Sequence, residues 1–553
     1  MIRKTPLFLI ALFLVFSVFS QEGINPLPKS WGLKLTENPK VIQLSPLDLN
    51  SVYSQDSIND LDKTIPWRYG IERPLSLNIH NGGLWTELSN GAKIWRAAVR
   101  SPGALNLSFN FGEFYLPPGS RLQLYDDAHR AIPQTILSSQ NRNSNLLGTW
   151  FVEGEVVWIE YYQPPHNSIS PRLQLSSIIH GYRMGGVNTT NPDRNRLNGS
   201  GACNYDVNCP IGEDFDSQKD ILKKSVAFVN LGNGYLCSAV LVNNTKADKT
   251  PYLLTANHCL TNSNPALWSI RFNWVSPSPV CGTGEESGDL NNNFTVSGAQ
   301  LMANNRLSDF ALVKLYDAIP ESWDVAFAGW DNSDTDPLFG VGIHHPNGDI
   351  MKICRDDSGA QKIDANGTKV WLIGGGQHGT GNGWEIGTTE SGSSGSPLFN
   401  EKGKIIGQLY AGESACVGNV NNHNYDIYGR FGISWRAGNS PESRLMDWLD
   451  PSFSGQTTME TLQNILNVPD HEYIGELKIY PNPVNTFITI ENARYPHLKY
   501  QFFNILGQQI KYGSLANTMN TISVEDLAEG VYLLQLTDEA SSDAITKKIV
   551  VKR

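Results

Sequence analysis

Apolar and polar residues alternate along the first third of the chain in short stretches separated by turn-forming residues. Residues 105–117, 121–126 and 155–162 place apolar side chains at every second position, and Gly, Pro and Asn stand between the stretches. A period of two is typical of β-strands with one buried face. We therefore expect residues 21–197, which contain no cysteine, to form a β-rich domain.

Short apolar stretches also fill the region 198–468. They lie at 226–232, 236–243, 251–256, 310–316, 369–375 and 404–410. Helical spacing appears at 443–450 and less clearly at 459–466. A region of roughly 270 residues with many short strands and a terminal helix predicts an all-β fold of two antiparallel barrels.

The last region, 469–553, returns to strand-length units with turn residues between them. Examples are residues 476–484, 530–537 and 547–553. This spacing predicts an immunoglobulin-like β-sandwich. A module that binds sugar or protein is an alternative that the pattern leaves open.

Residues 1–20 combine a basic start with an apolar run at 7–19. That run is too short to cross a bilayer as a helix, so it predicts a signal peptide that is removed on export. No other stretch of the sequence has the apolar length of a transmembrane helix. The polar, proline-broken stretch 188–201 is typical of a linker that a protease can cut.

The net charge and the cysteines argue against some classes of function and binding site. The net charge is −11 with no basic stripe, which argues against a nucleic-acid partner. Six of the seven cysteines can form three disulfides in an exported protein, with 15 possible connectivities. Zinc is a weaker alternative, because the sequence has no Cys-x-x-Cys pair.

Two further stretches could suggest a metal. Adjacent His344 and His345 point to opposite faces of an extended strand, so a structural role is preferred for them. The loop at 288–294 lacks the central glycine and terminal glutamate of a calcium loop. We therefore expect no metal and no organic cofactor.

The stretch SGSSGSP at 391–397 is either a flexible loop or a tight turn that presents a nucleophile. A serine nucleophile needs a histidine base and a carboxylate. His258 follows the apolar stretch 251–256, and a disulfide from Cys259 to Cys237 would hold its orientation. Asp309 stands just before the stretch 310–316. Each residue alone has a structural explanation, but the order His, Asp, Ser is one used by this chemistry.

TANHCL at 255–260 and GSSGSP at 392–397 resemble the markers of the chymotrypsin-like serine endopeptidases. The resemblance implies a double β-barrel in which Ser394 is the nucleophile, flanked by Ser393 and Ser396. It also implies His258 as base, Asp309 as its orienting group, and an oxyanion hole from the N–H groups of Gly392 and Ser394. Trypsin-like zymogens carry an aspartate where Ser393 stands, so control by a removable leading domain is expected instead.

Residues 198–455 resemble the bacterial lysyl endopeptidases more closely. The segments that carry this resemblance are SGACNYDVNCP, VNNTKADKTPYLLTANHC, LSDFALVKL, FAGWD, GIHHPNGD, ESGSSGSPLF, IIGQL, DIYGR and SRLMDWLDPS. The family implies three disulfides: Cys203–Cys416, Cys209–Cys281 and Cys237–Cys259. Cys354 has no partner in that scheme, and we expect a free thiol.

The same resemblance implies the specificity. The aspartate of DIYGR, Asp426, would lie at the bottom of a pocket and pair with a basic side chain. The family places a histidine after Gly-Gln-Leu, where this chain has Tyr410, with Trp371 as the expected stacking partner. This substitution leaves basic specificity intact but opens the alternative of a broader Lys/Arg endopeptidase.

The C-terminal segments IYPNPV, FNILGQ, LAEGVYLLQL and KKIVVKR resemble the sorting domain of the type IX secretion system. This implies passage through periplasm and outer membrane to a secreted or surface-attached state. Family precursors are cut at a lysine, but Arg194, Arg196 and Leu197 precede SGAC. Either the enzyme accepts arginine or, as we favour, another protease completes maturation.

We therefore expect a signal peptide (1–20), a β-rich propeptide (21–197), a serine protease domain (198–468) and a sorting domain (469–553). The expected function is a monomeric, secreted serine endopeptidase that cuts protein or peptide substrates after lysine through an acyl-enzyme. An inactive protease-like binding protein and a surface adhesion module are the alternatives.

Overall fold

A computed structural model gives the fold of most of the chain. It describes residues 27–129, 134–183, 199–283, 285–288, 294–463, 477–492, 498–504, 508–515, 517–538 and 544–553. The expected signal peptide lies outside the described residues, as do most of the linker 188–201 and of the loop 288–294. The chain divides into two compact units, 1–462 and 463–553. Among the described residues, no helix combines the length and apolar character needed to span a membrane.

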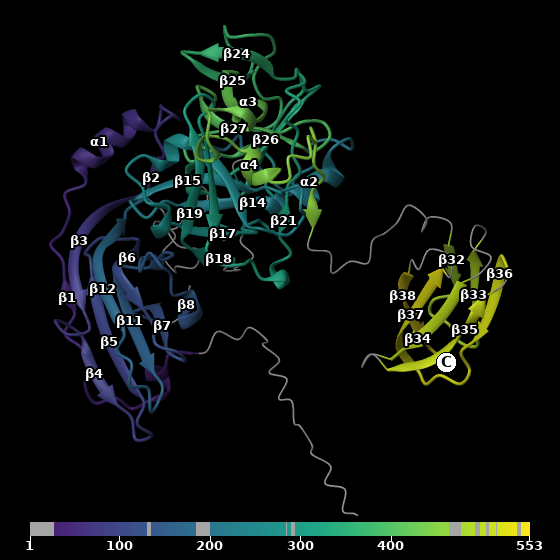
Figure 1. Cartoon of the computed structure of the whole chain (residues 1–553), viewed down its shortest axis with the longest axis horizontal. Helices are drawn as coiled ribbons and strands as arrows, with labels where there is room; N and C mark the ends of the chain where they lie inside the picture. The colour runs from purple at the N-terminus through teal and green to yellow at the C-terminus, as the bar shows by residue number, and fades with distance from the viewer. Residues whose placement is uncertain are drawn as a thin grey trace, which may run out of the picture. The chain divides into compact units, whose positions relative to one another are not determined.

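The leading part of the first unit is a sandwich of two sheets (Figure 1). One sheet contains β1 (Ile42–Gln43), β4 (Leu84–Glu87), β5 (Lys93–Arg100), β7 (Arg121–Asp126), β8 (Gln134–Leu137) and β11 (Val156–Gln163). The other contains β3 (Gly70–Asn78), β6 (Asn106–Tyr115), β9 (Leu147–Gly148), β10 (Val152–Glu153) and β12 (Arg172–Gly181). Alternate apolar residues such as Phe109, Leu122 and Ile159 fill the core between them.

Two eight-stranded sheets build the middle part of the same unit. The first contains β2 (Trp67–Arg68), β14 (Val226–Asn230), β15 (Tyr235–Leu241), β16 (Tyr252–Ala256), β17 (Ser269–Phe272), β18 (Phe294–Ser297), β19 (Ala299–Asn305) and β20 (Phe310–Leu315). The second contains β13 (Tyr205–Asp206), β22 (Gly340–His344), β23 (Lys352–Asp356), β24 (Gln361–Ala365), β25 (Thr368–Ile373), β26 (Pro397–Phe399), β27 (Ile405–Gly412) and β30 (Asp426–Arg430).

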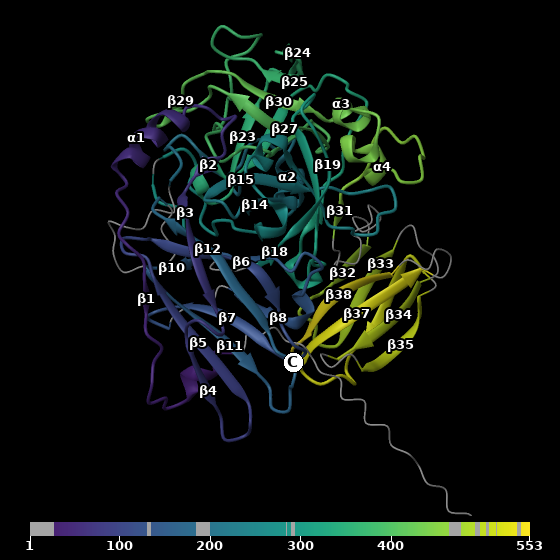
Figure 2. The ribbon, with the colours of Figure 1, turned by 60° about the vertical axis from the view of Figure 1, so that its left-hand side comes forward.

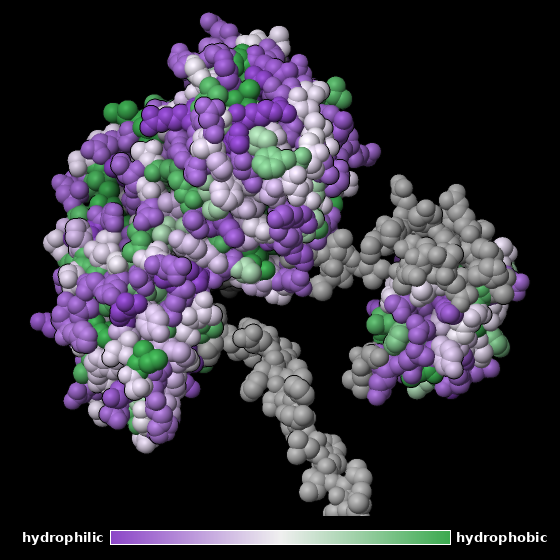
Figure 3. Space-filling model, in the orientation of Figure 1, coloured by the Kyte–Doolittle hydropathy of each residue, from purple (hydrophilic) through white to green (hydrophobic). Residues whose placement is uncertain are grey.

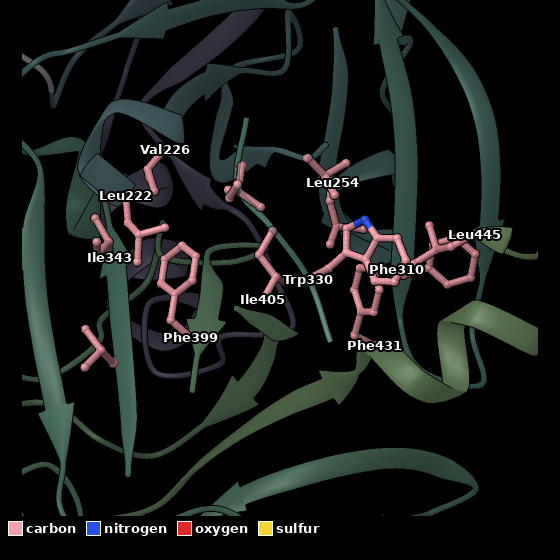
Figure 4. Close-up of a cluster of buried hydrophobic side chains, with 14 of the residues drawn as sticks. Leu222, Val226, Leu254, Phe310, Trp330, Ile343, Phe399, Ile405, Phe431 and Leu445 are labelled. Carbon is pink, nitrogen blue, oxygen red and sulfur yellow. The ribbon is translucent and has the colours of Figure 1, made fainter. Parts of the chain in front are cut away.

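One apolar core joins these two sheets (Figure 4). Leu254 and Phe310 come from the first sheet, and Ile343 and Phe399 come from the second; all four are fully buried. Trp330 lies among them and donates its indole N–H to the carbonyl oxygen of Asn243 at 2.9 Å. The all-β class is confirmed, and the closure of each sheet into a barrel stays a prediction.

The helices are short and differ from those expected. They are α1 (Asn50–Asn59), α2 (Asp216–Leu222), α3 (Phe431–Arg436) and α4 (Met446–Leu449), with 3-10 turns η1 (Lys29–Gly32), η2 (Ser138–Gln140), η3 (Lys223–Ser225), η4 (Asn257–Leu260), η5 (Pro265–Leu267), η6 (Glu321–Trp323), η7 (Pro346–Gly348) and η8 (Pro441–Ser443). The helix expected at 443–450 is therefore confirmed only in part, as α4.

The helix expected at 459–466 is wrong where the structure describes it. Residues Leu462–Gln463 form β31, which pairs with β21 (Ala326–Phe327). Met459 exchanges two backbone hydrogen bonds with Trp330, at 2.8 and 3.2 Å. Pairing with a distant segment thus outweighs a weak local helical preference. A small hairpin, β28 (Cys416–Val417) with β29 (Val420–Asn421), completes the middle part.

The leading sandwich and the middle part lie directly beside each other (Figures 1 and 2). Strand β2 leaves the leading part to pair with β15, matching Arg68 to Tyr235 and Trp67 to Leu236. Apolar residues from both parts share one buried cluster: Trp67, Tyr69, Trp150, Phe151, Ile179, Phe228, Leu236, Trp274 and Ile350. On the face drawn in Figure 3, apolar side chains are scattered among polar ones.

The second unit is a smaller β-sandwich. One sheet contains β32 (Leu477–Tyr480), β33 (Phe487–Asn492) and β36 (Met519–Ser523), and the other contains β34 (Leu498–Phe503), β35 (Gln509–Leu515), β37 (Gly530–Asp538) and β38 (Ala544–Val551). Ile488, Phe502 and Leu534 are fully buried between them. The strand pattern seen in the sequence corresponds to these strands.

Candidate active site

The serine turn is held in one conformation by two glycines. Gly392 has φ +92° and Gly395 has φ +80°, values that favour glycine. A Cβ atom on Gly395 would lie 2.1 Å from Thr255 Oγ1, so no larger residue fits there. Ser394, between the glycines, accepts a hydrogen bond from the Ser238 N–H at its carbonyl oxygen, at 2.8 Å. The turn is therefore fixed and is not a flexible surface loop.

His258 and Asp309 are brought together by strand pairing. His258 lies in η4 directly after β16, Asp309 precedes β20, and the two strands pair with Ala256 opposite Phe310. The Asp309 carboxylate accepts from the His258 backbone N–H at 3.0 Å, and its second oxygen lies 2.7 Å from His258 Nδ1. Because a carboxylate only accepts, Nδ1 carries the proton and Nε2 of the neutral ring is left as an acceptor.

The His258 ring presents that acceptor inside the protein. Its Nε2 is buried and has no hydrogen-bond partner among the described residues. Asp309 has φ +52°, an unusual value for a non-glycine residue, and this backbone strain is found where the surrounding structure fixes a functional geometry. The arrangement leaves one ring nitrogen free to accept a proton.

Ser394 lies against the segment that carries His258. The Cys237–Cys259 disulfide joins β15 to η4, with the two Cα atoms 6.5 Å apart. Cys259 Sγ lies 4.0 Å from the Ser394 carbonyl oxygen. The Ser394 backbone thus lies beside the residue that follows His258, and Asp309 contacts His258 directly.

Asp426 is buried and surrounded by polar side chains. It begins β30, it is fully buried, and it is paired with Gly412 of β27 and Ile373 of β25. One carboxylate oxygen accepts from Trp384 Nε1 at 2.7 Å, Thr389 Oγ1 at 2.7 Å and Ser414 Oγ at 2.5 Å. The other oxygen binds a cation from elsewhere in the chain.

That cation is Lys63, from the loop between α1 and β2. Its ammonium lies 2.8 Å from Asp426 Oδ1, and it also donates to Thr389 Oγ1 and Ser414 Oγ at 2.8 Å. The Lys63 side chain is 95% buried. The Lys63 carbonyl oxygen accepts a hydrogen bond from Ser394 Oγ at 3.0 Å. One lysine therefore spans the distance between the buried carboxylate and the serine.

The disulfides agree with the expected pairing. Cys203 is bonded to Cys416, Cys209 to Cys281, and Cys237 to Cys259. Cys354 is free and buried, as expected. Burial, with the nearby Asp426 charge, raises the pKa of the Cys354 thiol well above its ordinary value, so the thiol stays neutral.

Cys237, His258 and Cys259 have ligand atoms close enough together for a metal. The two cysteines are bonded to each other, so their sulfur atoms cannot act as thiolate ligands. His344 and His345 face different partners: Ser393 Oγ lies 2.8 Å from His344 Nδ1, whereas His345 Nδ1 lies 2.9 Å from the Asp349 carbonyl oxygen. Neither group of residues offers a shared metal site.

The expected contact between Tyr410 and Trp371 is corrected by the structure. Trp371 is buried, donates to the Ile406 carbonyl oxygen at 2.9 Å, and its ring faces Lys362 and Arg430. The pairing of β27 with β30 shifts register between Leu409 and Ala411. Tyr410 is the extra residue at that bulge, and its ring centroid lies 6.3 Å from that of His258. A bulge redirects a side chain, and here it directs Tyr410 toward the histidine.

Several residues of this site were missed by the sequence interpretation. Trp384, Thr389, Ser414 and Lys63 all bind at Asp426. Thr389 stands close to the serine stretch, which is the one sequence signal that could have found it. Lys63 lies 331 residues before Ser394, and no sequence motif links the two.

Comparisons with known proteins agree with this picture. Residues 197–429 match the family "Lysyl endopeptidase, C-terminal domain", and residues 478–552 match the "Secretion system C-terminal sorting domain". A lysyl endopeptidase of Pseudomonas aeruginosa is 26% identical over 288 residues, which is 48% of this chain and 56% of that protein. The chain thus spans little more than half the length of this relative.

Two solved structures show only a weak similarity to this chain. An inactive serine-to-alanine mutant of Rv3671c from M. tuberculosis H37Rv has a TM-score of 0.24 and 11% identity, over 44% of this chain and 90% of that one. The BSP domain of a biofilm associated protein has a TM-score of 0.12 and 7% identity, over 89% of this chain and 83% of that one.

The sorting domain at the C-terminal end indicates export to a secreted or cell-surface location. The middle region therefore carries the lysyl endopeptidase C-terminal domain, and the end of the chain carries a secretion system sorting domain.

Proposed function

We propose that this protein is a secreted serine endopeptidase that hydrolyses peptide bonds on the carboxyl side of lysine. Ser394 attacks the carbonyl carbon of the scissile bond, and His258 Nε2 takes the serine proton and returns it to the leaving amine. Asp309 keeps the imidazole in the required tautomer through its contact with Nδ1. Water then hydrolyses the acyl-enzyme.

The observation that carries this proposal is the position of Lys63. A lysine ammonium lies at Asp426 while the carbonyl oxygen of the same lysine lies 3.0 Å from Ser394 Oγ. A substrate lysine placed in the same way would bring its carbonyl group to the nucleophile. This distance relationship supports both the choice of Ser394 and the role of Asp426 in substrate binding.

The chemistry of the pocket favours lysine over arginine. An ammonium has three N–H donors, and the pocket provides three oxygen partners at 2.8 Å, from Asp426, Thr389 and Ser414. A guanidinium is planar, larger and carries five donors, so it would leave some donors unpaired in this buried site. A broader Lys/Arg specificity is the alternative that a direct comparison of substrates decides.

The oxyanion hole is proposed at the N–H groups of Gly392 and Ser394. The positive φ of Gly392 allows the tight turn that this assignment requires, and a Cβ atom there would lie 3.1 Å from both Asn347 N and His345 O. Two aligned N–H donors stabilise the negative charge that develops on the carbonyl oxygen, typically by a few kcal/mol.

The proposed domain organisation is that of a secreted protease with a pro-region. Residues 1–20 act as signal peptide, 21–197 as a pro-region, 198–468 as the protease and 469–553 as the sorting domain. The β-strand pairing of the leading part with β15 supports a pro-region that assists folding of the protease.

The test is a comparison of peptide amides that end in lysine, arginine or glutamate, with and without a serine-directed phosphonate. We expect lysyl cleavage that the phosphonate abolishes and that Ser394→Ala reduces by at least about 10³-fold. Ser396→Ala, two residues away in the same turn, is the matched control and should keep most of the activity. Equal loss in both variants, or cleavage that survives Ser394→Ala, contradicts the proposal.

A further inference from the structure

The lysine in the pocket belongs to this chain, and it occupies the place of a substrate. We propose that Asp62, Lys63 and Thr64 form an intramolecular pseudo-substrate that closes the active site, and that Lys63–Thr64 is the bond it presents for self-cleavage. This inference rests on the proposed function. It adds an autoinhibitory contact and a cleavage site within the leading part. This cleavage site is far from the expected boundary between propeptide and protease domain at residues 197 and 198.

Lys63 makes two contacts expected of a bound lysyl substrate, one through its ammonium and one through its carbonyl oxygen. The side chain fills the pocket and neutralises Asp426, and the carbonyl group meets Ser394. A cavity of about 810 Å³ opens beside the segment, lined by residues that include Leu61, Glu390, Ser391 and Glu413. A peptide substrate can reach Asp426 only after Lys63 has left.

The segment is anchored on both sides, which makes it a rigid ligand. Before it, Asp56 of α1 accepts from Arg68 Nε at 2.8 Å and from the Tyr182 hydroxyl at 2.5 Å. Arg183 forms an ion pair with Asp60. After it, β2 joins β15 as an additional strand. Because the segment is already ordered and attached, its binding costs little entropy and its effective concentration is high.

Asp62 holds both sides of the bond together. Its carboxylate accepts from the Thr64 N–H at 2.9 Å and from the Thr64 hydroxyl at 2.6 Å, and the Ile65 N–H donates to the Asp62 carbonyl oxygen at 3.0 Å. The nitrogen of Thr64 is the leaving group when Lys63–Thr64 is cut. A leaving amine that is tethered in place can attack the acyl-enzyme again, so net cleavage is slow and the segment acts as an inhibitor.

The covalent step is ordinary peptide hydrolysis. Ser394 Oγ bonds to the Lys63 carbonyl carbon, and its proton passes through His258 Nε2 to the Thr64 nitrogen as the C–N bond breaks. Water then adds to the Lys63 ester, releases Ser394 and leaves a Lys63 carboxylate and a Thr64 amine. Only water is consumed.

The first experiment measures access to the site in the full-length chain that keeps its leading part. A fluorescent phosphonate carrying a lysine side chain labels the reactive serine, and gel electrophoresis separates full-length from processed bands. We expect the full-length band of Lys63→Ala to label at least about tenfold faster than wild type, because the tethered competitor is removed. Lys40→Ala, an exposed lysine of the same leading part, is the control and should behave as wild type.

Equal labelling of the full-length wild type and Lys63→Ala bands would overturn the inference. If no band of any variant is labelled, processed or full-length, the proposed function itself fails and the inference fails with it. Labelling confined to processed bands, with none in full-length Lys63→Ala, would show that Lys63 is not what closes the site.

A second variant avoids any effect of Lys63→Ala on folding. Asp62→Ala removes the exposed carboxylate that tethers Thr64, so we expect the fragment that ends at Lys63 to accumulate at least about fivefold faster than in wild type. Mass spectrometry identifies the fragment, and Ser394→Ala should give none. Absence of this fragment from both wild type and Asp62→Ala would overturn the cleavage site.

Discussion

Asp309 contacts His258 at two points, accepting from its backbone N–H at 3.0 Å and lying 2.7 Å from its ring Nδ1. The first contact fixes the position of the residue, and the second fixes the tautomer of its ring. A single carboxylate therefore sets both the place and the proton distribution of the proposed base.

Asp309→Asn should separate these two effects. The amide oxygen can still accept one hydrogen bond, but the amide NH2 facing Nδ1 forces the ring proton onto Nε2. We expect kcat/KM for a lysyl peptide amide to fall by about 10³- to 10⁴-fold. A change of less than tenfold, with the thermal unfolding temperature unchanged, would contradict the role given to Asp309.

Asp426→Asn should remove the selectivity for a positive charge. The buried carboxylate provides the charge that pairs with the substrate ammonium, and an amide cannot replace it. We expect lysyl turnover to fall at least about 100-fold while turnover of a leucyl peptide changes little. Asp364→Asn removes an exposed carboxylate that pairs with Lys369 and is the matched control. Loss of lysyl and leucyl turnover by the same factor would contradict the assignment.

Gly395→Ala should be far more damaging than Gly418→Ala. Both glycines have positive φ, +80° and +65°, so both substitutions introduce backbone strain of about 1 kcal/mol. Only Gly395 meets a neighbour, because its Cβ would lie 2.1 Å from Thr255 Oγ1, whereas nothing lies within 4 Å at Gly418. We expect an additional loss of about 2 kcal/mol or more in the free energy of unfolding. Urea unfolding of both variants measures the difference.

The Cys237–Cys259 disulfide should stabilise the part that carries His258. It closes a loop with a sequence separation of 22 residues, for which the chain-entropy model gives about 3 kcal/mol. The double substitution of both cysteines by alanine should lower the free energy of unfolding by that amount. Cys354→Ala, which removes a buried thiol that forms no disulfide, is the comparison. Equal losses would show that packing, not the cross-link, is responsible.

His345 should make the first unit less stable in acid. It is buried against the rings of Phe228 and Trp274, and burial lowers its pKa to about 3. Below the ordinary pKa of 6.5 the unfolded chain binds a proton that the folded chain does not, so stability falls as pH decreases from about 6.5 toward 3.

The measurement for His345 is the pH dependence of urea unfolding for wild type and His345→Gln. Between pH 7 and pH 5 wild type should lose about 2 kcal/mol more than the variant. The comparison is needed because burial raises the pKa of Asp356 to about 7, which acts in the opposite direction in both proteins. Parallel pH profiles would show that His345 does not titrate as proposed.

Local sequence patterns were sufficient for most of the strands. The alternation at 121–126 and the apolar stretch at 310–316 correspond to β7 and β20, and most residues of both strands are buried. The helices were harder to predict from the sequence. Residues 459–466 have a weak helical pattern, and pairing of Leu462–Gln463 with β21 decides their structure.

The sequence by itself determined which side chains can perform the chemistry: a histidine after one strand, an aspartate before another, and a serine between two glycines. Their types and order carry that information because nucleophilic catalysis requires those functional groups. Only the tertiary structure decided what surrounds them. Asp426 gains Trp384, Thr389, Ser414 and Lys63 as partners, and a bulge directs Tyr410 to His258. These contacts join residues up to 363 positions apart, a distance over which no local pattern constrains which residues meet.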